Sequence, residues 1–131
     1  MRSFNKVIFV MLAAFGFSAC SSKTSESGSE YRKISAQEAK QMIDSDKSII
    51  ILDVRTKEEF RQGYIKNALM ITDSELKEKA PSALPDKNAK ILVYCRSGRR
   101  SKTSAKLLIS MGYKNVYDFG GIIDWPYETV K

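Results

Sequence analysis

Two uninterrupted apolar runs constrain the fold of this chain more than any other feature. Residues 49–54 read IIILDV and residues 91–94 read ILVY, so apolar side chains occupy consecutive positions rather than alternate ones. A strand with one face in water alternates apolar and polar residues, whereas a strand covered on both faces of a parallel sheet is almost continuously apolar. Both runs therefore predict central strands of a sheet with helices on each face.

Helical patterns occur between the predicted strands. Ser35 with Glu38, and Thr56 with Glu59, have the spacing of a capping box, which satisfies free N–H groups at a helix start. Helices are predicted over residues 36–43, 57–63, 74–79 (before Pro81) and 101–111 (before Gly112). Shorter elements are a strand at 68–71, a strand from Val116, a turn at Gly120–Gly121 and a helical turn at 122–125. This alternation predicts an α/β fold with a mainly parallel sheet.

Composition excludes several classes of function. The 131 residues suggest one domain, and the formal net charge is +7. The chain has no histidine, and its two cysteines are Cys20 and Cys95. The commonest general base and metal ligand is therefore absent, and no metal or other cofactor is expected. No long basic run or aromatic-studded basic stripe occurs in the sequence, so nucleic acid is not an expected partner.

The first 19 residues are predicted to be a signal peptide. Arg2 and Lys6 precede an apolar run over residues 7–17, which is too short for a comfortable bilayer crossing. Residues 17–20, Phe-Ser-Ala-Cys, resemble a bacterial lipobox, although Phe17 stands where leucine is usual. The resemblance implies cleavage before Cys20 and acylation of that cysteine. The competing interpretations are an ordinary secretory signal and a retained N-terminal anchor.

A polar segment separates this leader from the folded domain. Residues 20–33 contain the lipidated cysteine and a serine-rich stretch without apolar periodicity, which predicts a flexible tether. The folded domain is then expected over residues 34–131. A lipid anchor followed by a tether predicts a protein of the cell envelope, held at a membrane and facing the periplasm or the cell exterior.

Cys95 is predicted to be a reactive nucleophile. It ends the second apolar run, and the polar loop Arg96-Ser97-Gly98-Arg99-Arg100 separates it from the helix that begins at Ser101. Ligands of open α/β sheets bind outside the carboxyl ends of the strands, and free N–H groups at a helix start attract anions. These features favour the thiolate of Cys95. The alternative is an inert core thiol, which is the commonest fate of a free cysteine.

The residues around Cys95 are expected to form an anion-binding loop. Backbone N–H groups of residues 96–101 can surround an anion, and Gly98 allows the chain to turn tightly. Arg96, Arg99 and Arg100 add positive charge; Arg96 and Arg100 are the two expected to contact the anion, and a solvated basic face is the alternative.

The residues 95–101, CRSGRRS, closely resemble the active-site loop of rhodanese-like domains. The resemblance extends over residues 34–131 and includes four further segments in the family's order. These are Leu52-Asp53-Val54-Arg55 with Glu58-Glu59-Phe60, then Gly63-Tyr64-Ile65 with Ala68, then Gly112-Tyr113 with Val116, and finally Gly120-Gly121-Ile122 with Trp125. Tyr64 stands where the family usually has histidine; the position looks structural, so little loss of activity is expected. The resemblance implies a three-layer fold with about five strands.

The resemblance implies a sulfurtransferase that works by double displacement. Cys95 would take the outer sulfur of a donor such as thiosulfate, release sulfite and carry a persulfide that cyanide or a thiol then accepts. Asp53 and Arg55 would brace the loop, although a plain ion pair at the strand end is the alternative. The expected partners are this small anion, the acceptor and, through the lipid anchor alone, a membrane; a monomer is expected.

Two other functions stay open at this stage. Some relatives of the family hydrolyse phosphoesters with a Cys-x5-Arg loop, but here four residues separate Cys95 from Arg100, and Ser101 occupies the position of that arginine. A phosphate needs the longer loop, so loop length favours sulfur chemistry. A persulfide carrier or a protein-binding module without turnover is the other alternative.

Overall fold

The computed structural model describes residues 30–131, so the predicted signal peptide (1–19), Cys20 and most of the predicted tether lie outside the described residues. The described chain has the order β1 (Arg32–Lys33), α1 (Ala36–Ser45), β2 (Ile50–Asp53), α2 (Lys57–Arg61), β3 (Leu69–Met70), α3 (Leu76–Ala83), β4 (Lys90–Cys95), α4 (Arg99–Ser110), β5 (Asn115–Gly121) and the 3₁₀ turn η1 (Ile122–Asp124). No helix within residues 30–131 is long and apolar enough to span a bilayer.

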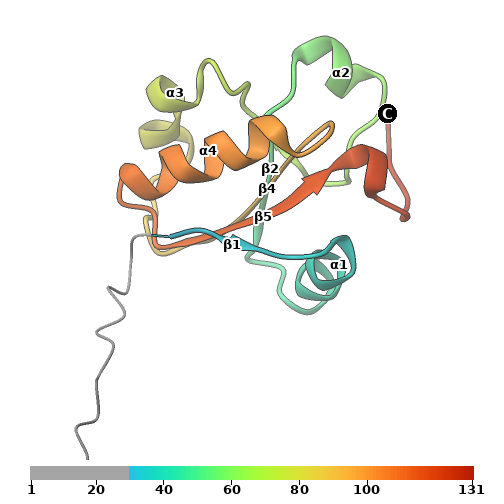
Figure 1. The fold of residues 1–131 in the computed structure, drawn as a ribbon, viewed down its shortest axis with the longest axis horizontal. Coiled ribbons are helices and arrows are strands. Elements are labelled where there is room, and N and C mark those ends of the chain that lie inside the picture. Colours follow the sequence, from blue (N-terminus) through green and yellow to red (C-terminus); the bar gives the residue numbers. More distant parts are fainter. Residues whose placement is uncertain (1–29) are drawn as a thin grey trace, which may run out of the picture.

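The five strands form one parallel sheet in the order β1-β5-β4-β2-β3. The two apolar runs become β2 and β4, which pair in the middle of the sheet, and the side chains from Ile91 to Cys95 are fully buried. Helices α3 and α4 cover one face, while α1 covers the other (Figure 1). The predicted α/β fold is confirmed, because strands that are apolar throughout need cover on both faces.

Several predicted element boundaries are wrong. Residues Arg32–Lys33 were expected in the tether but form β1, because their backbones pair with Tyr117 and Asp118 of β5. The helix expected to stop before Pro81 continues to Ala83, although a proline inside a helix removes a backbone hydrogen bond. The hydroxyl of buried Tyr113 also donates to the carbonyls of Ala80 and Leu84, at 3.0 and 2.6 Å, which secures that turn.

The third error concerns Gly120–Gly121, which was expected to form a turn. These residues are instead the last two of β5, and η1 follows directly. Gly120 adopts a φ of 89°, in the left-handed region, and its N–H donates to Asp118 Oδ1 at 2.9 Å. The side chain of Asp118 therefore supports a bend inside the strand where a separate turn was predicted.

Both predicted capping boxes are present. Ser35 and Glu38 satisfy each other's backbone N–H groups at the start of α1, and Thr56 and Glu59 do so at the start of α2. After α2, the ring of Tyr64 stacks on that of Phe60 with centroids 4.0 Å apart. Tyr64 also pairs through its backbone with Val130, so this position has a packing role in the fold.

Candidate active site

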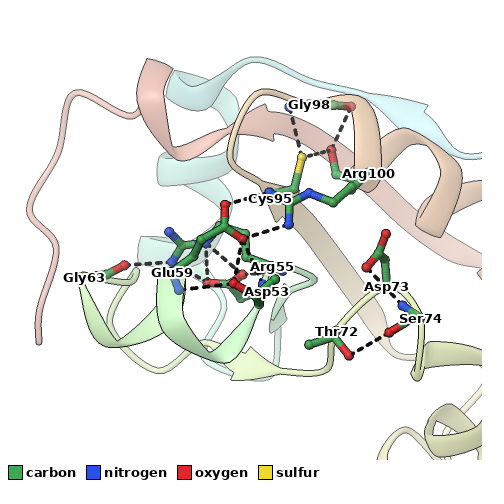
Figure 2. Close-up of polar contacts among 12 residues, drawn as sticks. Asp53, Arg55, Glu59, Gly63, Thr72, Asp73, Ser74, Cys95, Gly98 and Arg100 are labelled. Atoms are coloured by element: carbon green, nitrogen blue, oxygen red, sulfur yellow. Dashed lines mark hydrogen bonds and ion pairs between the residues drawn. The ribbon is translucent and has the colours of Figure 1, made fainter.

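Cys95 is the last residue of β4 and is fully buried at the base of the loop that follows. The N–H of Gly98 donates to Cys95 Sγ at 3.0 Å, and the thiol lies 3.5 Å from the hydroxyl oxygen of Ser101 (Figure 2). The Ser101 hydroxyl is also within hydrogen-bonding distance of the carbonyls of Gly98 and Gly120, at 3.1 and 3.3 Å. The loop therefore curls over the sulfur and presents a backbone donor to it.

Helix α4 begins two residues earlier than the sequence predicted, at Arg99 instead of Ser101. Gly98 adopts a φ of 101° at the residue before the helix, a conformation that glycine reaches without steric cost. Arg99 and Arg100 therefore belong to the first helical turn, and the loop proper is only Arg96-Ser97-Gly98. This shift places the positive end of a 12-residue helix next to Sγ.

Residues at the end of β5 and the start of η1 contact the backbone of the Cys95 loop. The pairing of β4 with β5 shifts register between Val93 and Cys95, so that Cys95 lies opposite Gly121. A Cβ on Gly121 would collide with the backbone carbonyl of Arg96, and the N–H of Ile123 donates to that carbonyl at 3.2 Å. A side chain at position 121 is therefore incompatible with the observed path of the loop.

Glu59 is a residue of the site that the sequence prediction missed, because it was assigned to a capping box and to a segment of the family resemblance without a role near Cys95. Its two carboxylate oxygens accept hydrogen bonds from Arg100 Nη1 and Nη2, each at 2.8 Å. The Arg100 guanidinium is the main reason that the pKa of Glu59 falls from 4.5 to about 2. Glu59 and Arg100 are 41 residues apart in the chain, so no local sequence pattern indicates this contact.

The three arginines that follow Cys95 therefore differ in whether they are bound to a carboxylate. Arg100 was expected to grip the anion, but both of its terminal nitrogens are bound to Glu59. Arg96 and Arg99 are exposed, and neither takes part in an ion pair among the residues that the structure describes. The positive charge that a soluble anion can reach therefore comes from Arg96 and Arg99, whereas Arg100 joins α4 to α2.

Asp53 and Arg55 do not brace the Cys95 loop by direct hydrogen bonds. Arg55 binds the Asp53 carboxylate through Nε and Nη2, and Nη2 also donates to the carbonyl of Gly63 at 2.7 Å. Both side chains are at most 5% exposed. The chain turns away from β4 after Val54, whose N–H donates to the Tyr94 carbonyl, so Arg55 reaches the end of α2 instead of the loop.

Tyr94 connects this buried ion pair to the residue before Cys95. It lies opposite Asp53 in the sheet, and the Arg55 guanidinium is 5.6 Å from the centre of its ring. Burial, followed by the charge of Asp53, raises the pKa of the Tyr94 hydroxyl far above its usual value, so the group is neutral. That hydroxyl accepts the N–H of Ile65 at 3.1 Å. The pair therefore supports β4; Arg55 lines a groove together with Arg96 but makes no hydrogen bond to the loop.

We predict that Gly121→Ala displaces the Cys95 loop. The new methyl group meets backbone atoms of Arg96 and Ser97, which cannot move aside as a flexible side chain can. The rate of alkylation of Cys95 should change by about 10-fold or more, since small misplacements at a site are costly. Gly112→Ala is the control: it strains a left-handed glycine with open space around it and should lower stability alone. Equal reactivity in the two variants would contradict the prediction.

The Glu59–Arg100 pair should make folding stability depend on pH. A carboxylate whose pKa is lower in the folded state contributes its full stabilisation above pH 4.5 and loses it as pH falls toward 2. Because both side chains are about a quarter exposed, we expect a contribution of about 1 kcal/mol. Urea unfolding of the wild type and of Glu59→Gln should differ by this amount at pH 7, and the difference should disappear only as pH falls through about 2. A difference that is constant with pH would show that the carboxylate charge is not responsible.

Comparisons with known proteins agree with this geometry. Residues 35–126 match the rhodanese-like domain family. The thiosulfate sulfurtransferase PspE of Escherichia coli is 39% identical over 80 residues, which is 61% of this chain and 77% of PspE. The putative sulfur carrier protein YrkF of Bacillus subtilis is 36% identical over 107 residues, 81% of this chain and 57% of YrkF.

A solved structure described as a rhodanese with anions, from E. coli, superposes with a TM-score of 0.60. It is 37% identical, and the match covers 63% of this chain and 98% of that one. The rhodanese-like fold is therefore the fold of this chain, and the reactive-loop sequence lies inside the matched region. On these grounds the chain belongs to the rhodanese-like domain family.

Proposed function

We propose that this protein transfers a sulfane sulfur from a thiosulfate-like donor to a thiol or to cyanide, with Cys95 as the carrier of the sulfur. The observation that carries the proposal is the Gly98 N–H directed at Cys95 Sγ, 3.0 Å away, at the start of α4. Such a donor stabilises negative charge on the sulfur both before and after it binds a second sulfur atom. The relatives PspE and YrkF, named for thiosulfate sulfurtransfer and sulfur carriage, support the same chemistry.

The first half of the reaction forms a persulfide on Cys95. The thiolate attacks the outer sulfur of thiosulfate, a new S–S bond forms, and sulfite leaves with the electron pair of the broken bond. Arg96 and Arg99 attract the doubly charged donor, since both are exposed beside the loop. No proton is transferred in this step, so the lack of histidine in the sequence is no obstacle.

The second half returns the enzyme to its starting state. An acceptor thiolate or cyanide attacks the outer sulfur of the persulfide, and Cys95 leaves as a thiolate. A groove of about 410 Å³ lies beside the loop, with Arg96, Glu59 and Ile123 among its lining residues. Ile123 is 64% exposed there, so an acceptor with an apolar part finds contact next to the loop. A carrier that delivers sulfur to a protein would use the same step.

The decisive measurement is mass spectrometry of the full-length protein after thiosulfate treatment. We expect about +32 Da, one sulfur atom, on the peptide that contains Cys95, together with one equivalent of sulfite. Cys95→Ser should show neither, and Ser97→Ala, in the same loop, serves as a folded control that retains the sulfur. An unmodified Cys95 peptide, or release of phosphate from an aryl phosphate at a higher rate than sulfite from thiosulfate, would reject the proposal.

We also propose that Cys20 carries a lipid that holds the domain at a membrane of the cell envelope. The support is the sequence of the leader, in which small residues precede Cys20. Expressed in a bacterium with labelled palmitate, the wild type should incorporate label and sediment with membranes. Cys20→Ala should lose both properties, whereas Cys95→Ser, which removes the other cysteine, should keep them. Label in Cys20→Ala, or no label in the wild type, would contradict lipidation.

A further inference from the structure

The exposed face of α4 carries only positive charge. Arg99, Lys102 and Lys106 are exposed and follow one another at helical spacing, so they lie along one face of the helix. The sequence of α4 contains no aspartate or glutamate. Within residues 30–131, none of these three side chains is in an ion pair. No carboxylate of the described residues forms an ion pair with this face, and the only acidic residue that lines a hollow with Lys106 is Glu30.

This charge continues beyond both ends of the helix. At the start of α4, which follows directly from β4 (Figure 1), Arg96 is exposed in the Cys95 loop. At the other end, Lys106 shares a surface hollow with Lys33 of β1. We name these five residues the basic row; they are Lys33, Arg96, Arg99, Lys102 and Lys106. The helical part from Arg99 to Lys106 is about 10 Å long at 1.5 Å per residue.

A small sulfur donor does not account for the basic row. An anion of the size of thiosulfate, bound at the loop, is within reach of Arg96 and Arg99. Lys102 and Lys106 lie roughly one and two helical turns further along α4, and at physiological salt the field of an exposed charge falls off over about 8 Å. Lys106, about 10 Å beyond Arg99, therefore contributes little to binding an anion at the loop, and the row as a whole matches a partner with a surface larger than the donor.

Two other large polyanions fit the basic row less well. Helix α4 offers no aromatic side chain on which a nucleic acid base could stack, and the one aromatic residue in the hollow of Lys33 and Lys106, Tyr31, is half-buried. A membrane surface that contacted the whole row would also cover the mouth of the Cys95 loop, because Arg96 and Arg99 flank it. A protein can instead contact the row with acidic side chains and place one of its own residues at the loop.

We propose that the basic row docks an acidic surface of a protein whose cysteine thiol accepts the sulfur from Cys95, an inference that rests on the proposed function. The acceptor thiolate attacks the outer sulfur of the Cys95 persulfide. The S–S bond to Cys95 breaks, Cys95 keeps its electron pair as a thiolate, and the acceptor becomes the persulfide. No oxidant or reductant is consumed. Opposite charges speed such an encounter by 10-fold to 1,000-fold and lose this effect as salt rises.

The test measures sulfur transfer from full-length protein that has been loaded with thiosulfate. Two peptides of equal length serve as acceptors, each with one cysteine, flanked by aspartate and glutamate in one and by serine and asparagine in the other. The quantity of interest is the ratio of the two transfer rate constants at low salt. Intrinsic differences between the peptide thiols cancel when this ratio is compared between protein variants. We expect Lys102→Glu/Lys106→Glu to lower the ratio by about 10-fold, and 0.5 M salt to remove most of that difference.

Lys47→Glu/Lys66→Glu is the matched control. Both lysines are exposed, they line a groove on the α1 side of the sheet, and the double reversal changes net charge by the same amount. An unchanged ratio in this control supports the basic row as the docking surface. An equal fall of the ratio in both double variants, or no fall in either, overturns the docking proposal. The proposal is also overturned if the Lys102/Lys106 reversal abolishes binding to phosphatidylglycerol vesicles and leaves the peptide ratio unchanged. Absence of any persulfide would instead reject the proposed function.

Discussion

The hydrogen bond from the Gly98 N–H to Cys95 Sγ depends on a close backbone approach at the end of β5. Residues 96–98 can pass over the sulfur only because Gly121, opposite Cys95 in the sheet, has no side chain to obstruct the Arg96 carbonyl. The Ile123 N–H then holds that carbonyl in place. The reactive loop is thus shaped by the last strand of the sheet as much as by its own residues.

Two ion pairs fix the surroundings of this loop without entering the chemistry. Asp53 and Arg55 are buried and tie β2 to the carbonyl of Gly63 after α2, while Glu59 and Arg100 tie α2 to the first turn of α4. The buried Asp53–Arg55 pair contributes little net stability, because desolvation offsets the attraction, but it admits few alternative arrangements. We therefore regard both pairs as devices that set the relative positions of α2, β4 and α4.

The partition of the arginines has a direct electrostatic consequence. Arg100 is matched by a carboxylate, so its charge is largely cancelled as seen from a distance, whereas Arg96 and Arg99 keep theirs. The exposed positive charge next to the loop is therefore that of Arg96 and Arg99, and Lys102 and Lys106 extend it along α4.

The amino-acid sequence by itself determined the central strands, the capped starts of α1 and α2, and the position of Cys95 at the end of a strand. Those features follow from local patterns of burial and hydrogen bonding, which a few neighbouring residues specify. The leader and its cysteine were also read from the sequence, and they stay predictions because they lie outside the described residues. Local sequence patterns did not predict that Gly120–Gly121 belong to β5 or that α4 begins at Arg99. Glycine is equally compatible with turns, bends and strand ends, so its presence does not distinguish them.

Only the tertiary structure decided which carboxylate Arg100 binds, where Arg55 points and which backbone passes next to Gly121. The contacts of Arg100 and Gly121 join segments that are distant along the chain: Glu59 and Arg100 are 41 residues apart, and Gly121 meets a loop on the neighbouring strand. Such pairings are fixed by sheet order and helix packing, and no spacing within the sequence encodes them. The position of Cys95 at the end of a strand could therefore be predicted from the sequence, whereas the contacts of its charged neighbours depended on how the layers pack.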